Sequence, residues 1–152
     1  MNMTDANHLK NKVLFGKAQE ATIALDVLRR EFDVADLDFL LAAYNRRRKT
    51  IDRIEVIEML GGIQTEATID AMKNIVLASS VPLVRYYALR NLIESSVSIN
   101  QFRPRRTNSS FWLSLETYEK YLRGEITKDQ LKNIAEAFAL DRDYHWVWLA
   151  EI

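Results

Sequence analysis

Few residues of this 152-residue chain have the types and spacing that chemistry at a site requires. There is no cysteine, which excludes thiolate metal ligands, a cysteine nucleophile and disulfide bonds. The two histidines are His8 and His145, and neither has a metal-ligand spacing. The chain also lacks a glycine-rich phosphate-binding motif and a G-x-S-x-G nucleophile motif. These patterns favour a protein that is not an enzyme and that holds neither a metal ion nor a cofactor.

Closely spaced carboxylates are the remaining candidates for acid–base catalysis. Glu55 and Glu58 are three residues apart, so they share one face of a predicted helix. General acid–base chemistry would require them to meet Asp52 in a pocket that perturbs their pKa values. Nothing in the sequence places the three carboxylates together, so we interpret them as solvated charges.

A second group of residues suits contact with a macromolecule. Tyr86, Tyr87, Arg90 and Asn91 lie away from the apolar stripe of their predicted helix. Tyrosine and arginine are favoured as anchors of protein interfaces. The competing interpretation is that these side chains are half-buried against the C-terminal segment.

Charge is unevenly distributed, although Lys+Arg and Asp+Glu both total 21. Residues 97–112 contain Arg103, Arg105 and Arg106 and no acidic residue. These arginines could bind phosphates, the acidic face of a partner, or the acidic C-terminal segment of the chain itself. Together with the basic residues 46–49, and with tyrosines as stacking platforms, they support nucleic-acid binding as an alternative function. The zero net charge argues against that alternative.

Amphipathic helices must position all of these residues. A hydrophobic content of 48% excludes disorder, and only four glycines and two prolines argue against an all-β fold. Asp33 is the expected N-cap of the helix predicted at residues 34–45. Gly61-Gly62 is the expected end of the helix predicted at residues 50–60. Residues 144–152 fit either a helix or a strand, and Gly16 leaves open a first helix that begins only after it. Apolar residues at steps of three or four predict about seven helices, at residues 7–32, 34–45, 50–60, 65–78, 82–95, 111–123 and 127–140.

The predicted helices repeat at a period of 32 residues, which places Arg53 on Arg85. The segment 80–92 (Ser-Val-Pro-Leu-Val-Arg-Tyr-Tyr-Ala-Leu-Arg-Asn-Leu) is similar to the inter-helix turn of HEAT-like helical repeats. The first pair departs from this pattern, because it has no proline and has Asp52 where Val84 stands. An Ala/Val, Ile/Leu, Leu triplet recurs three times, at Ala24, Leu25 and Leu28, at Val56, Ile57 and Leu60, and at Ala88, Leu89 and Leu92.

The resemblance to HEAT-like repeats is best over residues 33–95, weak over 7–32 and absent over 96–152. It implies a stack of antiparallel helical hairpins with a surface for binding macromolecules. It also implies that the arginine at the position of Arg53 and Arg85 braces neighbouring hairpins through an aspartate.

We therefore expect an all-α, single-domain protein: a short stack of antiparallel helical hairpins with a C-terminal capping segment. Its expected parts are an N-terminal helix (7–32), a first hairpin (33–63), a second hairpin (64–96), a basic loop (97–112) and a helical cap (113–152). Because a stiff stack loses little entropy on association, we expect a non-enzymatic protein-binding module. The specific hypothesis is a bacterial immunity protein that neutralises a toxin by direct binding.

The expected partner is another protein, such as a toxin domain, with nucleic acid as the alternative. No signal peptide or bilayer-spanning stretch is found in the sequence, so we expect a cytoplasmic protein with neither a membrane nor a metal ion as partner. The candidate partner-binding residues are Glu55, Glu58, Tyr86, Tyr87, Arg90, Asn91, Arg103, Arg105 and Arg106.

Overall fold

The computed structural model describes residues 3–105, 107–141 and 143–152, so that Arg106 lies outside the described residues. Over these ranges the chain has nine α-helices, two 3-10 helices and no strand. The expected all-α fold class is therefore confirmed. The described residues form two more α-helices than the seven expected, because the first predicted helix is split in two and part of residues 144–152 is helical.

The chain forms two compact units, Met1–Ser95 and Ser96–Ile152. We call them the N-terminal unit and the C-terminal unit. Their boundary falls where the second predicted hairpin ends, and our expectation of a single domain stays a prediction.

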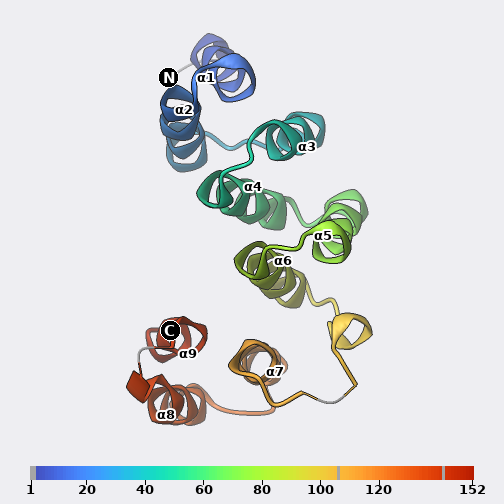
Figure 1. Cartoon of the computed structure of the whole chain (residues 1–152), viewed down its shortest axis with the longest axis vertical. Coiled ribbons are helices and arrows are strands. Elements are labelled where there is room, and N and C mark those ends of the chain that lie inside the picture. The colour runs from blue at the N-terminus through green and yellow to red at the C-terminus, as the bar shows by residue number, and fades with distance from the viewer. Residues whose placement is uncertain (1–2, 106, 142) are drawn as a thin grey trace. The chain divides into compact units, whose positions relative to one another are not determined.

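The N-terminal unit contains six helices that pair in order along the chain as α1–α2, α3–α4 and α5–α6. The second helices of these pairs lie side by side, since α4 packs against both α2 and α6, and α1 also contacts α3 (Figure 1). Short connections make each pair an antiparallel hairpin. The bounds are α1 (Met3–Phe15), α2 (Ala18–Glu31), α3 (Leu37–Arg46), α4 (Thr50–Ile63), α5 (Glu66–Ala78) and α6 (Pro82–Glu94).

The single helix expected over residues 7–32 is wrong, because the chain breaks at Gly16 and Lys17. Gly16 donates its N–H to the Lys12 carbonyl oxygen at 2.8 Å and so ends α1. Lys17 then takes an extended conformation before α2 begins. Glycine has a low helix propensity, which makes this the point where a long amphipathic segment folds back on itself.

Capping residues mark the starts of α3 and α5, and a proline marks the start of α6. Asp36, not Asp33, caps α3, and its Oδ1 accepts a hydrogen bond from the Phe39 N–H at 3.1 Å. Thr65 and Thr68 form a capping box at the start of α5. Pro82 occupies the first turn of α6, as expected, where a missing N–H costs nothing.

Helix α4 continues past Gly61 and Gly62, where we expected it to end, and stops at Ile63. Gln64 follows with a φ of 55°, so a non-glycine residue takes the left-handed conformation at the helix end. Gly61 does not end the helix but lies where α6 packs against α4. A Cβ atom at this position would lie 2.8 Å from Cγ of Asn91, and thus glycine allows α6 to cross α4 closely.

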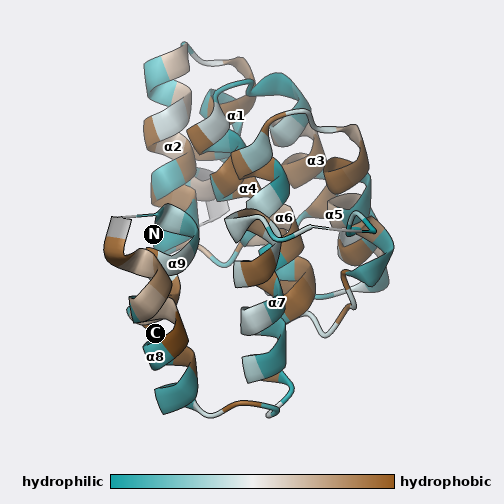
Figure 2. Cartoon of the chain, turned by 60° about the horizontal axis from the view of Figure 1, so that its bottom comes forward, coloured by the Kyte–Doolittle hydropathy of each residue, from teal (hydrophilic) through white to brown (hydrophobic). Residues whose placement is uncertain are grey.

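The repeated apolar triplets form the part of the N-terminal unit's core that its second helices contribute. All nine residues are buried, and none is more than 2% exposed. In Figure 2 hydrophobic segments alternate with hydrophilic ones along the helices, as amphipathic helices require. The period of 32 residues thus marks the positions at which the second helices α2, α4 and α6 contribute to the core.

The C-terminal unit is built from three helices with an aromatic core. Trp146 stacks on Phe138 with ring centroids 4.7 Å apart, and Trp148 meets Tyr118 edge-on at 4.8 Å. Helix α8 packs against α9, and α7 contacts both. The capping box expected at Thr127 is confirmed, because its Oγ1 accepts from the N–H of the third helical residue at 3.1 Å. The elements are η1 (Asn100–Phe102), α7 (Ser110–Leu122), α8 (Lys128–Phe138), η2 (Ala139–Asp141) and α9 (Tyr144–Ala150).

Candidate functional site

Charged side chains from three successive second helices gather on one side of the N-terminal unit. Glu55 and Glu58 lie about one turn apart on α4. Arg29 of α2 donates from Nη1 to Oε2 of Glu55 at 2.9 Å. On α6, Nε of Arg90 lies 3.5 Å from Oε1 of Glu94. We call these five residues the charged face.

Glu58 is half-buried and lies between the cations of the two neighbouring helices. Burial raises the pKa of its carboxyl group above the ordinary value, because the charged form loses hydration. The positive charge of Arg90 acts in the opposite direction, and the negative charge of Glu94 reinforces the rise. Arg29 and a hydrogen bond from Asn91 also favour the charged form without cancelling the effect of burial. An additional cation from a partner would therefore stabilise the Glu58 carboxylate.

Of the four candidate residues on α6, two are buried, one belongs to the charged face and one lies beside it. Tyr86 is 1% exposed and Asn91 is 3% exposed, so neither offers a contact surface. Asn91 donates from Nδ2 to the Tyr87 carbonyl oxygen at 2.9 Å. Tyr87 is half-buried, and the Arg90 guanidinium lies 5.7 Å from its ring centroid. Tyr87 and Arg90 are therefore the α6 residues that remain candidates for contact.

Arg29 and Glu94 belong to the charged face but were not among the candidates predicted from sequence. Glu94 had a signal, since an acidic residue four positions after Arg90 is a helix ion-pair spacing. Arg29 had none, because its partner Glu55 is 26 residues away on another helix.

A hollow of about 410 Å³ adjoins the charged face at the carboxyl ends of α2 and α4. Arg29 and Glu58 line it together with Phe32, Asp33 and Met59. The hollow thus combines two carboxylates and a cation with apolar walls. It is suited to receive a long side chain with an apolar stem and a polar end.

The equivalent arginines Arg53 and Arg85 make equivalent hydrogen bonds. Nε of Arg53 donates to the Tyr44 carbonyl oxygen at 3.3 Å, and Nε of Arg85 donates to the Val76 carbonyl oxygen at 3.3 Å. Arg53 also donates to the Arg47 carbonyl oxygen at 2.9 Å, and its guanidinium lies 4.5 Å from the Tyr44 ring centroid. Each arginine therefore ties its helix to the end of the preceding helix of the same hairpin through backbone carbonyls, whereas the resemblance implied a brace between neighbouring hairpins through an aspartate.

A second hollow, of about 660 Å³, lies between α3 and α5. Leu37, Leu41, Ala71 and Ile75 form much of its apolar lining, and Arg53 lies at its wall. The charged residues of this lining are Asp70 and Arg53, which already donates to two carbonyl groups, so the hollow gathers fewer charges than the charged face.

The basic clusters are arranged differently in the two units. In the C-terminal unit Arg103 forms an ion pair with Glu116 of α7, while Arg105 is exposed. In the N-terminal unit Arg48 and Lys49 are exposed, and the Arg46 guanidinium lies 4.8 Å from the Phe15 ring centroid. Arg103 therefore fixes the loop within its own unit.

The carboxylates considered for acid–base chemistry have separate surroundings. Asp52 is buried, and its Oδ1 accepts a hydrogen bond from the Thr22 hydroxyl at 2.9 Å, whereas Glu55 pairs with Arg29. Asp143 of the C-terminal unit, which is not one of these three carboxylates, caps α9 and accepts a hydrogen bond from the His145 N–H at 3.0 Å. Burial acts to raise the pKa of Asp143, but the His145 N–H, the Ser110 hydroxyl and the His145 ring outweigh it, and the pKa lies below its ordinary value. A role as N-cap accounts for this carboxylate.

Comparisons with protein-family models, with curated proteins and with solved structures gave no match to this chain. Among the described residues, no helix has the length and apolar character needed to cross a bilayer.

Proposed function

We propose that this protein is a non-enzymatic module that binds another protein through the charged face of its N-terminal unit. The observation that carries the proposal is the gathering of Arg29, Glu55, Glu58 and Arg90 from three helices beside a hollow. Three rigid helices present these charges, so that little conformational entropy is lost when a partner binds.

We further propose that the N-terminal unit is a short HEAT-like stack of helical hairpins. The equivalent bonds of Arg53 and Arg85 support this interpretation, since they recur at the period of the sequence repeat. A second correspondence supports it too. The ion pair Asp26–Arg30 on α2 and the ion pair Arg90–Glu94 on α6 occupy positions two periods apart, with the signs of charge reversed.

The partner we propose has a basic side chain for the hollow and an acidic group for Arg29 or Arg90. Glu58 supplies the strongest reason, because a half-buried carboxylate with a raised pKa gains when a cation approaches it. The specific form of the proposal is a bacterial immunity protein that acts in the cytoplasm and neutralises a toxin by direct binding. It rests on the size of the chain and its helical architecture.

Nucleic-acid binding has less support. Arg103 is ion-paired with Glu116, and Tyr86 is buried, so neither is placed to contact phosphates or stack on bases.

A charge swap tests the proposed face without removing its internal ion pair. The double variant Arg29→Glu with Glu55→Arg keeps the pair between α2 and α4 but reverses the charges presented to a partner. A protein captured from cell lysate by the wild-type chain is identified, purified and titrated calorimetrically. We expect submicromolar affinity for the wild-type chain and affinity at least about tenfold weaker for the swap, because like charges across an interface are strongly unfavourable.

The matched control is Lys132→Glu with Glu136→Lys on α8, which also conserves net charge and lies outside the charged face. This variant should bind like the wild-type chain. Equal affinity for the charge swap and the wild-type chain would contradict the proposed face. Absence of any protein partner at submicromolar affinity would contradict the function, and growth rescue by co-expression with the captured protein tests its immunity form.

A further inference from the structure

The turns within the three hairpins of the N-terminal unit lie along one edge of that unit (Figure 1). The carboxyl ends of α1 and α3 are adjacent, because Arg46 lies over the Phe15 ring. The starts of α2 and α4 are adjacent, because Thr22 donates to Asp52. Helix α6 runs alongside α4 in the same direction, with Asn91 against Gly61 near their carboxyl ends. We call residues 12–17, 46–51 and 77–81 the turn edge.

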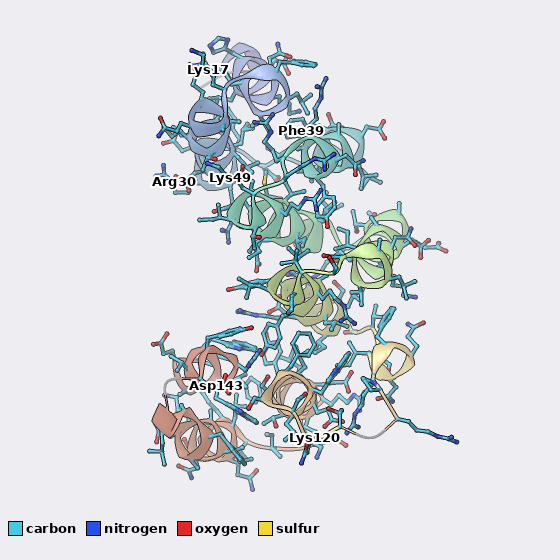
Figure 3. The ribbon with its side chains drawn as sticks, in the orientation of Figure 1. Lys17, Arg30, Phe39, Lys49, Lys120 and Asp143 are labelled. Carbon is cyan, nitrogen blue, oxygen red and sulfur yellow. The ribbon has the colours of Figure 1, made fainter. Side chains whose placement is uncertain are left out.

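The turn edge is strongly basic. It contains six cations, all but one of which are exposed, and the carboxylate of Glu20 in the first turn of α2 lies beside Gly16. Lys17 and Lys49 stand at the first two turns (Figure 3). The opposite edge, formed by residues 31–38 and 64–66, contains five acidic residues and no cation. The two edges therefore differ in charge, although Arg30 in the last turn of α2 and Lys10, which pairs with Asp36, lie beside the acidic edge. The six cations are Lys12, Lys17, Arg46, Arg47, Arg48 and Lys49.

Exposed apolar side chains also concentrate on the turn edge. Phe15 is 67% exposed, Ile51 61%, Leu77 73% and Val81 36%. They are four of the five large apolar side chains that are exposed among the described residues of the N-terminal unit, the fifth being Ile23. Each lies in a turn or within two residues of one.

Apolar side chains surrounded by cations match the chemistry of an anionic phospholipid surface. The cations are attracted to lipid phosphates, and apolar side chains at the contact enter the boundary between headgroups and acyl chains. We propose that the turn edge docks the N-terminal unit on an anionic membrane surface. This contact is peripheral and needs no bilayer-spanning segment, and it departs from our sequence expectation that a membrane is not a partner.

The apolar side chains favour a lipid surface over nucleic acid. Ile51, Leu77 and Val81 are aliphatic and provide no ring on which bases stack. Phe15 is the single aromatic residue of the edge, so there is no second ring on which successive bases could stack. A phosphate backbone would use the cations alone and leave the exposed aliphatic groups in water.

Cosedimentation of the full chain with lipid vesicles tests the proposal. The vesicles contain either phosphatidylcholine alone or equal parts of phosphatidylcholine and phosphatidylglycerol. We expect binding to the anionic vesicles only, weakened by added salt. Arg48→Glu with Lys49→Glu should weaken that binding by at least about tenfold, because each cation near the surface contributes a severalfold gain. Ile51→Ser with Leu77→Ser should weaken it about fivefold and leave its salt dependence unchanged.

Matched controls separate the edge from general charge and hydrophobicity. Lys128→Glu with Lys132→Glu on α8, and Ile23→Ser with Leu140→Ser, change exposed or half-buried residues outside the turn edge and should retain wild-type binding. Equal binding to both vesicle types, or equal losses in the controls, would overturn the proposal. Binding of a duplex or single-stranded oligonucleotide without binding of anionic vesicles would overturn it in favour of nucleic acid. The swap of Arg29 and Glu55 should leave vesicle binding intact, so the two proposals fail separately.

Discussion

Hairpins α3–α4 and α5–α6 share a framework and differ in the surfaces that the framework carries. Arg53 and Arg85 make the same bond to the end of the preceding helix, and the buried triplets of α4 and α6 coincide at the period of 32 residues. Their turns differ, because one is a run of four basic residues and the other is Ser-Ser-Val-Pro. The bonds of these arginines and the buried triplets thus repeat, whereas the turns diverge.

The divergence has a consequence where the two hairpins meet. Glu58 of α4 and Arg90 of α6 occupy equivalent positions with opposite charges, and each influences the other across the charged face. A simple duplication would place like charges there and repel. Divergence at equivalent positions therefore allows neighbouring repeats to form a mixed-charge surface.

The largest effect on the free energy of unfolding is expected when α4 is given the residue that α6 has at an equivalent buried position. Gly61 of α4 is equivalent to Ile93 of α6, but Asn91 lies over Gly61. Gly61→Ile should lower the free energy of unfolding by more than about 2 kcal/mol, because overpacking strains the crossing of α4 and α6. Urea unfolding followed by circular dichroism measures the change.

The neighbouring glycine provides the control. A Cβ atom at Gly62 meets nothing within 4 Å, so Gly62→Ala should be neutral or stabilise the helix by up to about 1 kcal/mol. A mild effect of Gly61→Ile would show that Asn91 can move aside and that the close crossing is not required.

A smaller and unequal effect is expected at the two braces. Arg53→Ala removes hydrogen bonds to two carbonyl groups and a cation–π contact, whereas Arg85→Ala removes a bond to one carbonyl group. We expect losses of about 2 and about 1 kcal/mol in the free energy of unfolding, respectively, by the same measurement. Equal losses would mean that the turn contacts of Arg53 contribute nothing beyond the repeated bond.

The smallest effect on stability is expected at Glu58, whose charge is opposite to that of Arg90 at the equivalent position of α6. Because burial raises the folded-state pKa of Glu58, ionising this group at neutral pH opposes folding. Glu58→Gln should therefore raise the melting temperature slightly at pH 7. The advantage should disappear as the pH falls below the ordinary glutamate range, where the carboxyl group is protonated in both states.

Arg90→Met provides the second arm of this test. Removing the cation should raise the pKa of Glu58 further and steepen the loss of stability with rising pH. Glu136→Gln on α8 controls for the loss of an exposed carboxylate. A melting temperature of Glu58→Gln that follows wild type at every pH would contradict the burial of this group.

Local signals in the sequence determined most of the helices. Apolar spacing, the capping box at Thr127 and the proline at the start of α6 act over one or two turns, so their outcome could be predicted without knowing the fold. The repeated triplets also identified the core positions of the second helices, because positions that are apolar in every repeat are those that face the core.

Only the tertiary structure decided how the helices meet. It made Gly61 a crossing point instead of a helix end, and it brought Arg29 to Glu55. It also buried Tyr86, whose type alone had suggested an interface anchor. These outcomes depend on which surfaces approach one another in space. A periodic sequence defines the face of each helix, but the distance and direction of its neighbour arise from packing the whole unit.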